Sequence, residues 1–410
     1  MVISDPHITG YKFLDHMDPI GNPYTPNAGS RPAELAGREP ELEQFRVLVG
    51  RLRQGATEQS LVIKGLRGVG KTVLLNAFED LAENENFLTF YHELTPDSNL
   101  VEDLARDAET ALGRLKLSER AGKQVRSAFS HLKAIKLTGP DDFGLEVDLG
   151  GINEGTLTAD LTELFLQLGS AASAKKRGIA FFLDELQFVE ETQYRAMISA
   201  LHRCTQKQAP ITVAAAGLPQ IPRLSGEARS YAERLFDFPT IANLDEESAR
   251  RALTEPARKL GVGYTEEAAS EALAWTAGYP FYIQQLGKHA WNLAKASPIT
   301  IDDIEAAKPA AQESLDRSIY AVRIQRATTA QQRYMRAMAE LGEGPYRSGA
   351  VASKLGKTVG ALSVVRQDLI SKGLIYSTEQ YGFVDFTVPR FAEYMRRYMP
   401  YRRPRRSKKQ

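Results

Sequence analysis

The chain has 410 residues, which at roughly 100–200 residues per domain predicts two to four domains with a substantial core. Hydrophobic residues make up 43%, charged residues 25% and aromatic residues 9%, so a collagen-like repeat, a coiled-coil rod and a chain disordered throughout are excluded. The net charge is +1, and no apolar run reaches the roughly 18 residues that span a bilayer, so no membrane segment is expected.

Residues 1–35 are rich in proline, glycine and asparagine, and they predict an extended arm rather than regular structure. An early Asp5 without an apolar segment argues against a secretory signal. The single cysteine, Cys204, has no partner for an internal disulfide. We therefore expect a cytoplasmic protein in which Cys204 is a small buried hydrophobe.

Residues 36–243 alternate between short apolar strands and amphipathic helices. Helices are expected at 41–52, 100–136, 157–172 and 190–206, and strands at 60–64, 87–91, 179–184 and 211–216. This alternation predicts βαβ units, and hence an α/β fold with a parallel sheet flanked by helices. A small insertion is expected at about 138–156, with a strand of alternating pattern at 143–149.

The segment GLRGVGKT at 65–72 matches the phosphate-loop pattern G-x-x-x-x-G-K-[ST]. Its glycines let main-chain N–H groups turn around a phosphate, and the helix that follows adds partial positive charge. Lys71 is expected to reach the β- and γ-phosphates of ATP, and the Thr72 hydroxyl to ligate Mg²⁺. A plain glycine-rich turn is the structural alternative. The predicted nucleotide-binding residues of this segment are Gly65, Gly68, Val69, Gly70, Lys71, Thr72 and Val73.

An acidic pair, Asp184 and Glu185, ends the apolar strand at 179–184. Ligands of open α/β sheets bind at the carboxyl ends of the strands. Asp184 is therefore expected to hold Mg²⁺ together with Thr72, and Glu185 to orient the attacking water as a catalytic residue beside Lys71. A solvated strand end is the alternative for such a pair in isolation.

After the sheet the pattern becomes helical, and we expect an all-helical lid at 244–327. Residues 328–398 then predict a winged helix-turn-helix domain, with helices at 346–355 and 359–372 and strands at 374–377 and 383–388. Gly373 is expected to end the second helix in a left-handed cap, and Pro389 to stop the second strand.

The last segment of the chain, 399–410, is a basic tail. Residues 396–410 hold eight basic and no acidic residues, and the remaining 395 residues have 44 basic against 51 acidic ones, a net charge of −7. Such a tail attracts polyanions, and a solubilising end is the alternative. The DNA-binding candidates, from the second helix and the tail, are Arg366, Lys372, Arg402, Arg403, Arg405 and Arg406.

Five segments together resemble the AAA+ ATPases, and more narrowly the initiator-type (origin-recognition-like) and archaeal-type STAND-like ATP-binding proteins with a C-terminal winged helix. They are AGRE (36–39), GLRGVGKT (65–72), FFLDELQ (181–187), SYAERLF (230–236) and GYPFYIQQLGKHAW (278–291). The resemblance implies that Arg38 and Pro280 lie near the nucleotide. Many relatives carry a polar sensor at the end of the strand 211–216, where this sequence has only Gln220 as a candidate, so slow or partner-stimulated hydrolysis is expected.

The resemblance also implies that Arg234 is an arginine finger, which acts in trans and so requires a homo-oligomer. A guanidinium at that point would stabilise charge that develops on a neighbour's γ-phosphate. An ion pair with Glu233 or Asp237 is the alternative, and Arg223 and Arg229 are rival candidates for the finger.

Three functions compete. The first is an oligomerising Mg²⁺-dependent ATPase whose winged helix and tail engage DNA. The second is a STAND-like switch whose winged helix contacts a protein partner. The chain ends soon after the winged helix, which favours the first. A P-loop small-molecule kinase ranks last, because the helical lid and winged helix have no place in it.

Overall fold

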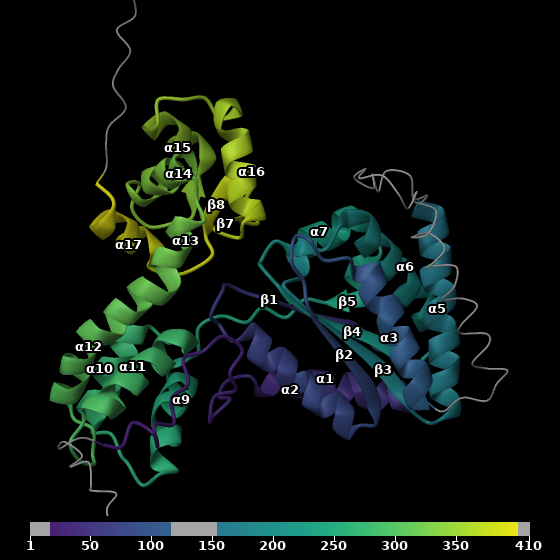
Figure 1. Ribbon diagram of the computed structural model, residues 1–410, viewed down its shortest axis with the longest axis horizontal. Helices are drawn as coiled ribbons and strands as arrows, with labels where there is room; N and C mark the ends of the chain where they lie inside the picture. Colours follow the sequence, from purple (N-terminus) through teal and green to yellow (C-terminus); the bar gives the residue numbers. More distant parts are fainter. Residues whose placement is uncertain (1–16, 116–153, 401–410) are drawn as a thin grey trace, which may run out of the picture. The chain divides into compact units, whose positions relative to one another are not determined.

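The computed structural model describes residues 17–115 and 154–400 (Figure 1). The predicted strand at 143–149 and the tail arginines 402, 403, 405 and 406 lie outside the described residues. The chain forms two compact units, one of Met1–Gly37 with Asn243–Val322 and the other of Arg38–Ala242 with Arg323–Gln410. Among the helices of the described ranges, none has the length and apolar character needed to cross a membrane.

The larger unit contains the predicted parallel sheet. The strands lie in the order β2-β3-β4-β1-β5, and their bounds are β1 Ser60–Lys64, β2 Phe87–Glu93, β3 Gly178–Asp184, β4 Ile211–Gly217 and β5 Phe236–Asp237. All neighbouring pairs are parallel, which confirms the α/β prediction. The two-residue β5 pairs with β1 and was not predicted, because a segment so short carries no periodic pattern.

Helices cover both faces of this sheet, as its near-continuous apolar strands require. Contacts place α1 (Glu39–Arg53) and α2 (Lys71–Asn84) on one face (Figure 1). The other face is covered by α3 (Leu100–Leu115), α5 (Glu154–Ala174) and α6 (Glu191–Gln206). Shorter elements follow β3 and β4, namely η2 Leu186–Phe188, α7 Ile221–Ala228 and α8 Ala232–Leu235.

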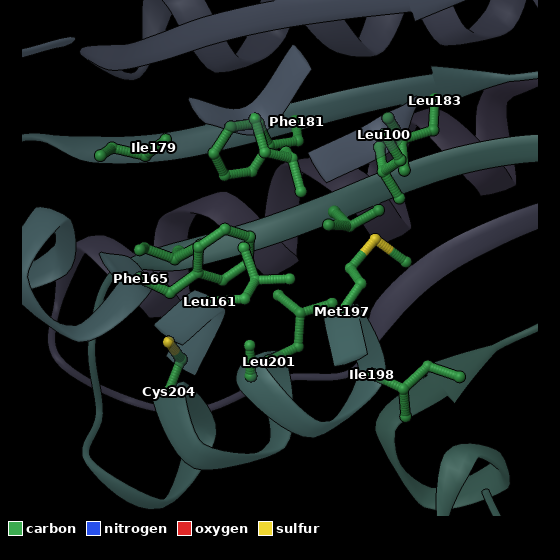
Figure 2. Packing of buried hydrophobic residues seen from close by; sticks show 14 of the residues in the cluster. Leu100, Leu161, Phe165, Ile179, Phe181, Leu183, Met197, Ile198, Leu201 and Cys204 are labelled. Carbon is green, nitrogen blue, oxygen red and sulfur yellow. The ribbon is translucent and has the colours of Figure 1, made fainter. Parts of the chain in front are cut away.

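A hydrophobic core fills the space between β3 and the helices α3, α5 and α6 (Figure 2). The rings of Phe165 and Phe181 stack there with centroids 5.3 Å apart. Met197, Leu201 and Cys204 of α6 complete the cluster in Figure 2. Cys204 is buried, so the prediction of a small buried residue is confirmed, and burial raises the pKa of its thiol to about 12.

The smaller unit contains the predicted helical segment. Its helices are α9 Glu246–Arg258, α10 Glu266–Thr276, α11 Pro280–Leu293, α12 Ile301–Leu315 and the π-helical turn η3 Asp316–Ala321. Side chains of Asp245, Thr265 and Thr300 cap the first turns of α9, α10 and α12. The described part of the N-terminal arm is extended and packs on this unit, where Trp291 donates to the Asp18 carbonyl at 2.9 Å.

The C-terminal segment has the helices and antiparallel sheet expected of a winged helix. Its elements are α13 Val322–Gln325, α14 Thr329–Ala339, β6 Tyr346–Arg347, α15 Ser348–Lys354, η4 Gly360–Leu362, α16 Ser363–Ser371, β7 Ile375–Ser377, β8 Phe383–Phe386 and α17 Phe391–Tyr398. The first predicted helix starts two residues later than expected because residues 346–347 pair with β8. Gly373 has the predicted left-handed conformation, with φ +62°.

Candidate nucleotide site

The phosphate loop connects β1 to α2, and its glycines have the backbone freedom that the pattern predicts. Gly68 and Gly70 are left-handed, with φ of +84° and +95°. A Cβ on Gly65 would lie only 2.4 Å from the Ile241 carbonyl oxygen. No side chain in the described part of the chain caps α2 at Gly70. The first N–H groups of that helix therefore face the loop, where an anion can accept from them.

Lys71 is the first residue of α2 and is buried, with 6% exposure. Its ammonium group bends over the loop and donates to the carbonyls of Gly65 at 3.1 Å and Leu66 at 2.8 Å. Burial lowers the pKa of Lys71 to about 8, and the nearby Glu185 and Asp184 carboxylates offset this shift only in part. A buried cation at the start of a helix suits a polyphosphate, which would restore its lost solvation.

The Thr72 hydroxyl donates to the Asp184 carboxylate at 2.5 Å, so the loop and the end of β3 meet as the sequence predicts. Asp184 is buried, and it also accepts from the Tyr91 hydroxyl at 3.2 Å. This contact arises because β2 and β3 are parallel neighbours whose carboxyl ends lie at one edge. Burial raises the pKa of Tyr91, which therefore remains a donor. A hydroxyl and a carboxylate side by side are hard oxygen ligands that fit Mg²⁺.

Glu185 follows β3 in a left-handed conformation, with φ +53°, and its side chain has other partners than that of Asp184. Both carboxylate oxygens accept hydrogen bonds from Arg67, at 2.7 and 3.2 Å. The Gln187 amide donates to the same carboxylate. Neither Arg67 nor Gln187 was among the predicted site residues. The only sequence signal was their position inside the two motifs, at places where the patterns allow any residue.

Gln187 also places a polar group at the end of β4, where many relatives carry a sensor. Its side-chain oxygen accepts from the Leu218 main-chain N–H at 3.1 Å. A Cβ on Gly217 would lie 3.0 Å from that oxygen, so the small residue leaves room for the amide. Gln220, the sequence-based candidate, is buried, and its side-chain oxygen has no hydrogen-bond partner in the described residues. Gln187 is thus the residue that links Glu185 to the end of β4.

Arg38 of the AGRE segment is buried and lies against the phosphate loop. Its guanidinium donates to the carbonyls of Val69 at 3.0 Å and Ala242 at 2.7 Å. Arg38 therefore connects the phosphate loop to the segment that follows β5. A contact between Arg38 and the nucleotide base stays a prediction, as does the role of Pro280, which lies in the first turn of α11 in the helical unit.

Arg234 lies on the short helix α8 and is exposed. Within the described residues it forms no ion pair with Glu233 or Asp237, and Asp237 instead accepts from the Gln44 amide. Its rival Arg229 donates to the Ser199 hydroxyl at 3.1 Å. An exposed guanidinium free of these two carboxylates agrees with a role toward a second chain, which remains a prediction.

The cationic candidates of the winged helix form hydrogen bonds within the C-terminal segment, Arg366 from a partly buried position and Lys372 from an exposed one. Arg366 donates to the Ser348 hydroxyl at 3.4 Å, and the Lys372 ammonium group donates to the Arg326 carbonyl at 3.1 Å and the Gln331 side chain at 3.0 Å. The exposed residues within α16 are Ser363, Val364, Gln367, Asp368 and Ser371. That surface lacks the positive charge of a typical DNA-reading helix.

A phosphate loop beside a strand-end Asp-Glu pair on a parallel sheet defines the P-loop ATPases. Residues 34–214 match the family described as AAA ATPase domain, and residues 317–395 match a domain of unknown function, DUF8462. Residues 34–214 thus form a P-loop domain of the AAA ATPase class. A search of curated proteins finds no match.

Several solved structures are similar. The Walker-type ATPase PABY2304 of Pyrococcus abyssi is 15% identical over 89% of this chain and 97% of that chain, with a TM-score of 0.56, which shows a shared fold. The Orc1 protein of Aeropyrum pernix in complex with DNA is 16% identical over 90% and 94%, with a TM-score of 0.44. The RuvB branch migration motor of Thermotoga maritima is 16% identical over 85% and 93%, with a TM-score of 0.42.

Proposed function

We propose that the chain is a Mg²⁺-dependent, oligomerising ATPase whose nucleotide state governs what its C-terminal segment binds. The observation that carries the proposal is the hydrogen bond between Thr72 and Asp184, which brings the phosphate loop and the strand-end acid to one point. Lys71 and Glu185 are the chain neighbours of these two residues. ATP hydrolysis needs this set: a phosphate cradle, a cation on the phosphates, a metal site and a carboxylate for the water.

Each residue then has a distinct task. The loop N–H groups and the start of α2 bind the phosphates, and Lys71 donates to the β- and γ-phosphates instead of the Gly65 and Leu66 carbonyls. Thr72 and Asp184 would hold Mg²⁺, which supplies positive charge to the phosphate oxygens when bound. Glu185 orients the attacking water and accepts its proton. Arg234 of a second copy of the chain stabilises the charge on the transferred phosphoryl group.

The trans role of Arg234 predicts that Arg234→Ala lowers ATP turnover by roughly tenfold or more, because a charge-assisted hydrogen bond of about 1.5 kcal/mol is lost in the transition state. ATP binding should be unchanged. The measurement is steady-state turnover over a range of protein concentrations, and turnover per subunit should rise with concentration in the unmodified chain only. Arg203→Ala, an exposed arginine on α6, is the matched control. Full activity of Arg234→Ala would show that Arg234 is not an arginine finger.

We propose that the ligand of the C-terminal segment is DNA. The proposal is supported by the eight basic residues of 396–410. Six of the eight follow α17, and if all six contact phosphates the tail contributes a salt slope of at most about −5 to DNA binding. A chain that ends at residue 400, which keeps α17 whole, should therefore bind duplex DNA more weakly and with a flatter salt dependence. Duplex DNA should also stimulate turnover of the full chain, with Lys71→Ala as the inactive control. Equal DNA affinity and slope for both chains would rule the tail out.

The second candidate, a nucleotide switch that signals to a protein partner, is supported by two observations. The exposed residues within α16 itself include no cation, and the exposed Lys372 directly after it already donates to the Arg326 carbonyl and the Gln331 side chain. The winged helix also contacts the phosphate loop, because the Arg67 N–H donates to the Thr387 carbonyl at 3.0 Å. A tightly bound, slowly hydrolysed nucleotide and no effect of DNA in the experiment above would favour this candidate.

A further inference from the structure

Arg67 lies in the phosphate loop, but its side chain is committed to the catalytic glutamate. The two guanidinium nitrogens donate to the two oxygens of Glu185 in a bidentate pair. The side chains are 23% and 18% exposed, so solvent screens this pair far less than it screens a surface ion pair. The phosphate loop and the residue that orients the water are therefore tied by one side chain.

The winged helix contacts the same residue in two ways. The Arg67 N–H donates to the carbonyl of Thr387, which is fully buried after β8. Gly373, the left-handed cap of α16, leaves space for the guanidinium: a Cβ at this position would lie 2.8 Å from Arg67 Nη2. The winged helix thus adjoins both the main chain and the side chain of Arg67.

A third contact lies at the margin of this interface. Lys64 at the end of β1 forms an ion pair with Glu379 in the turn between β7 and β8, with the atoms 3.6 Å apart. Glu379 is 89% exposed, so the pair contributes little to folding, and a substitution there perturbs docking without disturbing a core.

The donors on Glu185 bear directly on its function. Its oxygens accept from Arg67 and from Gln187, and a water that attacks a phosphate must be oriented by one of the same oxygens. A guanidinium that occupies both oxygens competes with that water. The competition ends only if the Arg67 side chain moves, while the Thr387 carbonyl fixes the main chain of Arg67 and Gly373 lies close to its guanidinium.

We propose that Arg67 is a positioning residue that restrains Glu185, and that docking of the winged helix on the phosphate loop maintains the restraint. A ligand that pulls the winged helix away releases Arg67 and frees Glu185 for catalysis. This inference rests on the proposed ATPase activity. It gives a chemical reason for the slow turnover that the sequence predicts, and it places the control in an interface between two segments of the same unit.

The first test is the steady-state kinetics of Arg67→Gln. If the ion pair restrains Glu185, its loss should raise kcat about three- to tenfold, as expected for a partly buried pair worth about 1 kcal/mol, and leave KM for ATP nearly unchanged. Arg67→Lys keeps the charge without the bidentate geometry, so its kcat should lie between that of the unmodified chain and that of Arg67→Gln. Arg46→Gln, which breaks the exposed pair with Glu43, is the matched control. A lower kcat for Arg67→Gln would overturn the restraint.

The second test addresses the winged helix. Glu379→Lys replaces attraction to Lys64 by repulsion and should raise kcat about twofold. In the Arg67→Gln background it should add nothing, because the restraint is already gone. Glu393→Lys, an exposed charge reversal on α17, should have no effect in either background. Additive effects of Glu379→Lys and Arg67→Gln would contradict the coupling.

The two proposals fail in different ways. If Lys71→Ala turns over ATP as fast as the unmodified chain, the proposed function fails. If turnover depends on Lys71 but neither Arg67→Gln nor Glu379→Lys raises it, the ATPase stands and the restraint fails.

Discussion

Lys71→Ala is expected to weaken ATP binding by at least about a hundredfold, since two charge-assisted hydrogen bonds of about 1.5–3 kcal/mol each are lost. Binding of a fluorescent ATP analogue measures the effect. Below pH 8 the protonated Lys71 opposes folding, because burial lowers its pKa from 10.5 to about 8, and this cost disappears as the pH rises toward 10.5. The alanine variant should therefore keep its thermal stability, so weak binding cannot be ascribed to unfolding.

The pH dependence of binding provides an internal check. At pH 9 only about a tenth of the nucleotide-free chain carries a protonated Lys71, so ATP affinity should fall above pH 8 and the complex should take up a proton. The Lys71→Ala variant should lose this part of the pH dependence. Lys207→Ala, an exposed lysine after α6, is the matched control and should bind ATP normally. If Lys71→Ala bound ATP as tightly as the unmodified chain, the assignment of the nucleotide site to this loop would be wrong.

Glu185→Gln is expected to lower kcat by about two to four orders of magnitude, the usual contribution of a general base, while ATP still binds. The substitution also removes one charge from the pair with Arg67. Although the restraint is lost with that pair, turnover should not rise, because the amide cannot accept the proton of the attacking water. Loss of turnover with retained binding therefore separates the role of Glu185 from the role of its partner.

Single-turnover measurements with saturating protein distinguish slow chemistry from slow product release in this variant. Glu191→Gln changes an exposed carboxylate in the first turn of α6 and should behave like the unmodified chain. A Glu185→Gln variant with normal turnover would show that another group activates the water.

The features that could be predicted from the sequence are those that depend on neighbouring residues. The strand 60–64, the glycines of the loop and the start of α2 follow from a local pattern, and the structure brings Thr72 and Asp184 into contact as expected. That contact is predictable between residues 112 positions apart because parallel strands place their carboxyl ends at one edge. The C-cap at Gly373 is predictable for the same local reason.

The partners of Glu185 could not be predicted, because they depend on rotamers and on distant segments. Arg67 occupies a position that the loop pattern leaves open, and Gln187 follows the acidic pair without a motif of its own. Their contacts with Glu185 require its left-handed backbone, which a sequence does not indicate for a glutamate. The contact between Arg67 and Thr387 joins residues 320 positions apart, and no local sequence pattern indicates it.

The DNA-binding candidates of α16 show a related limit. Arg366 and Lys372 have the spacing of an outward face, but long side chains can reach back to polar groups of their own module. Helical periodicity gives the direction of the Cα–Cβ bond, but it does not give the position of the charged group at the end of a flexible side chain. The hydrogen bonds of Arg366 and Lys372 therefore depend on tertiary structure.

The burial of Cys204 has a practical consequence. It is the one thiol in the sequence, and it is shielded by the packing in Figure 2. A cysteine introduced at an exposed position such as Tyr381 can therefore be tagged with a dye selectively, with no need to delete the native one. Because alkylation of Cys204 itself requires the core to open, its reaction rate gauges how often the large unit unfolds.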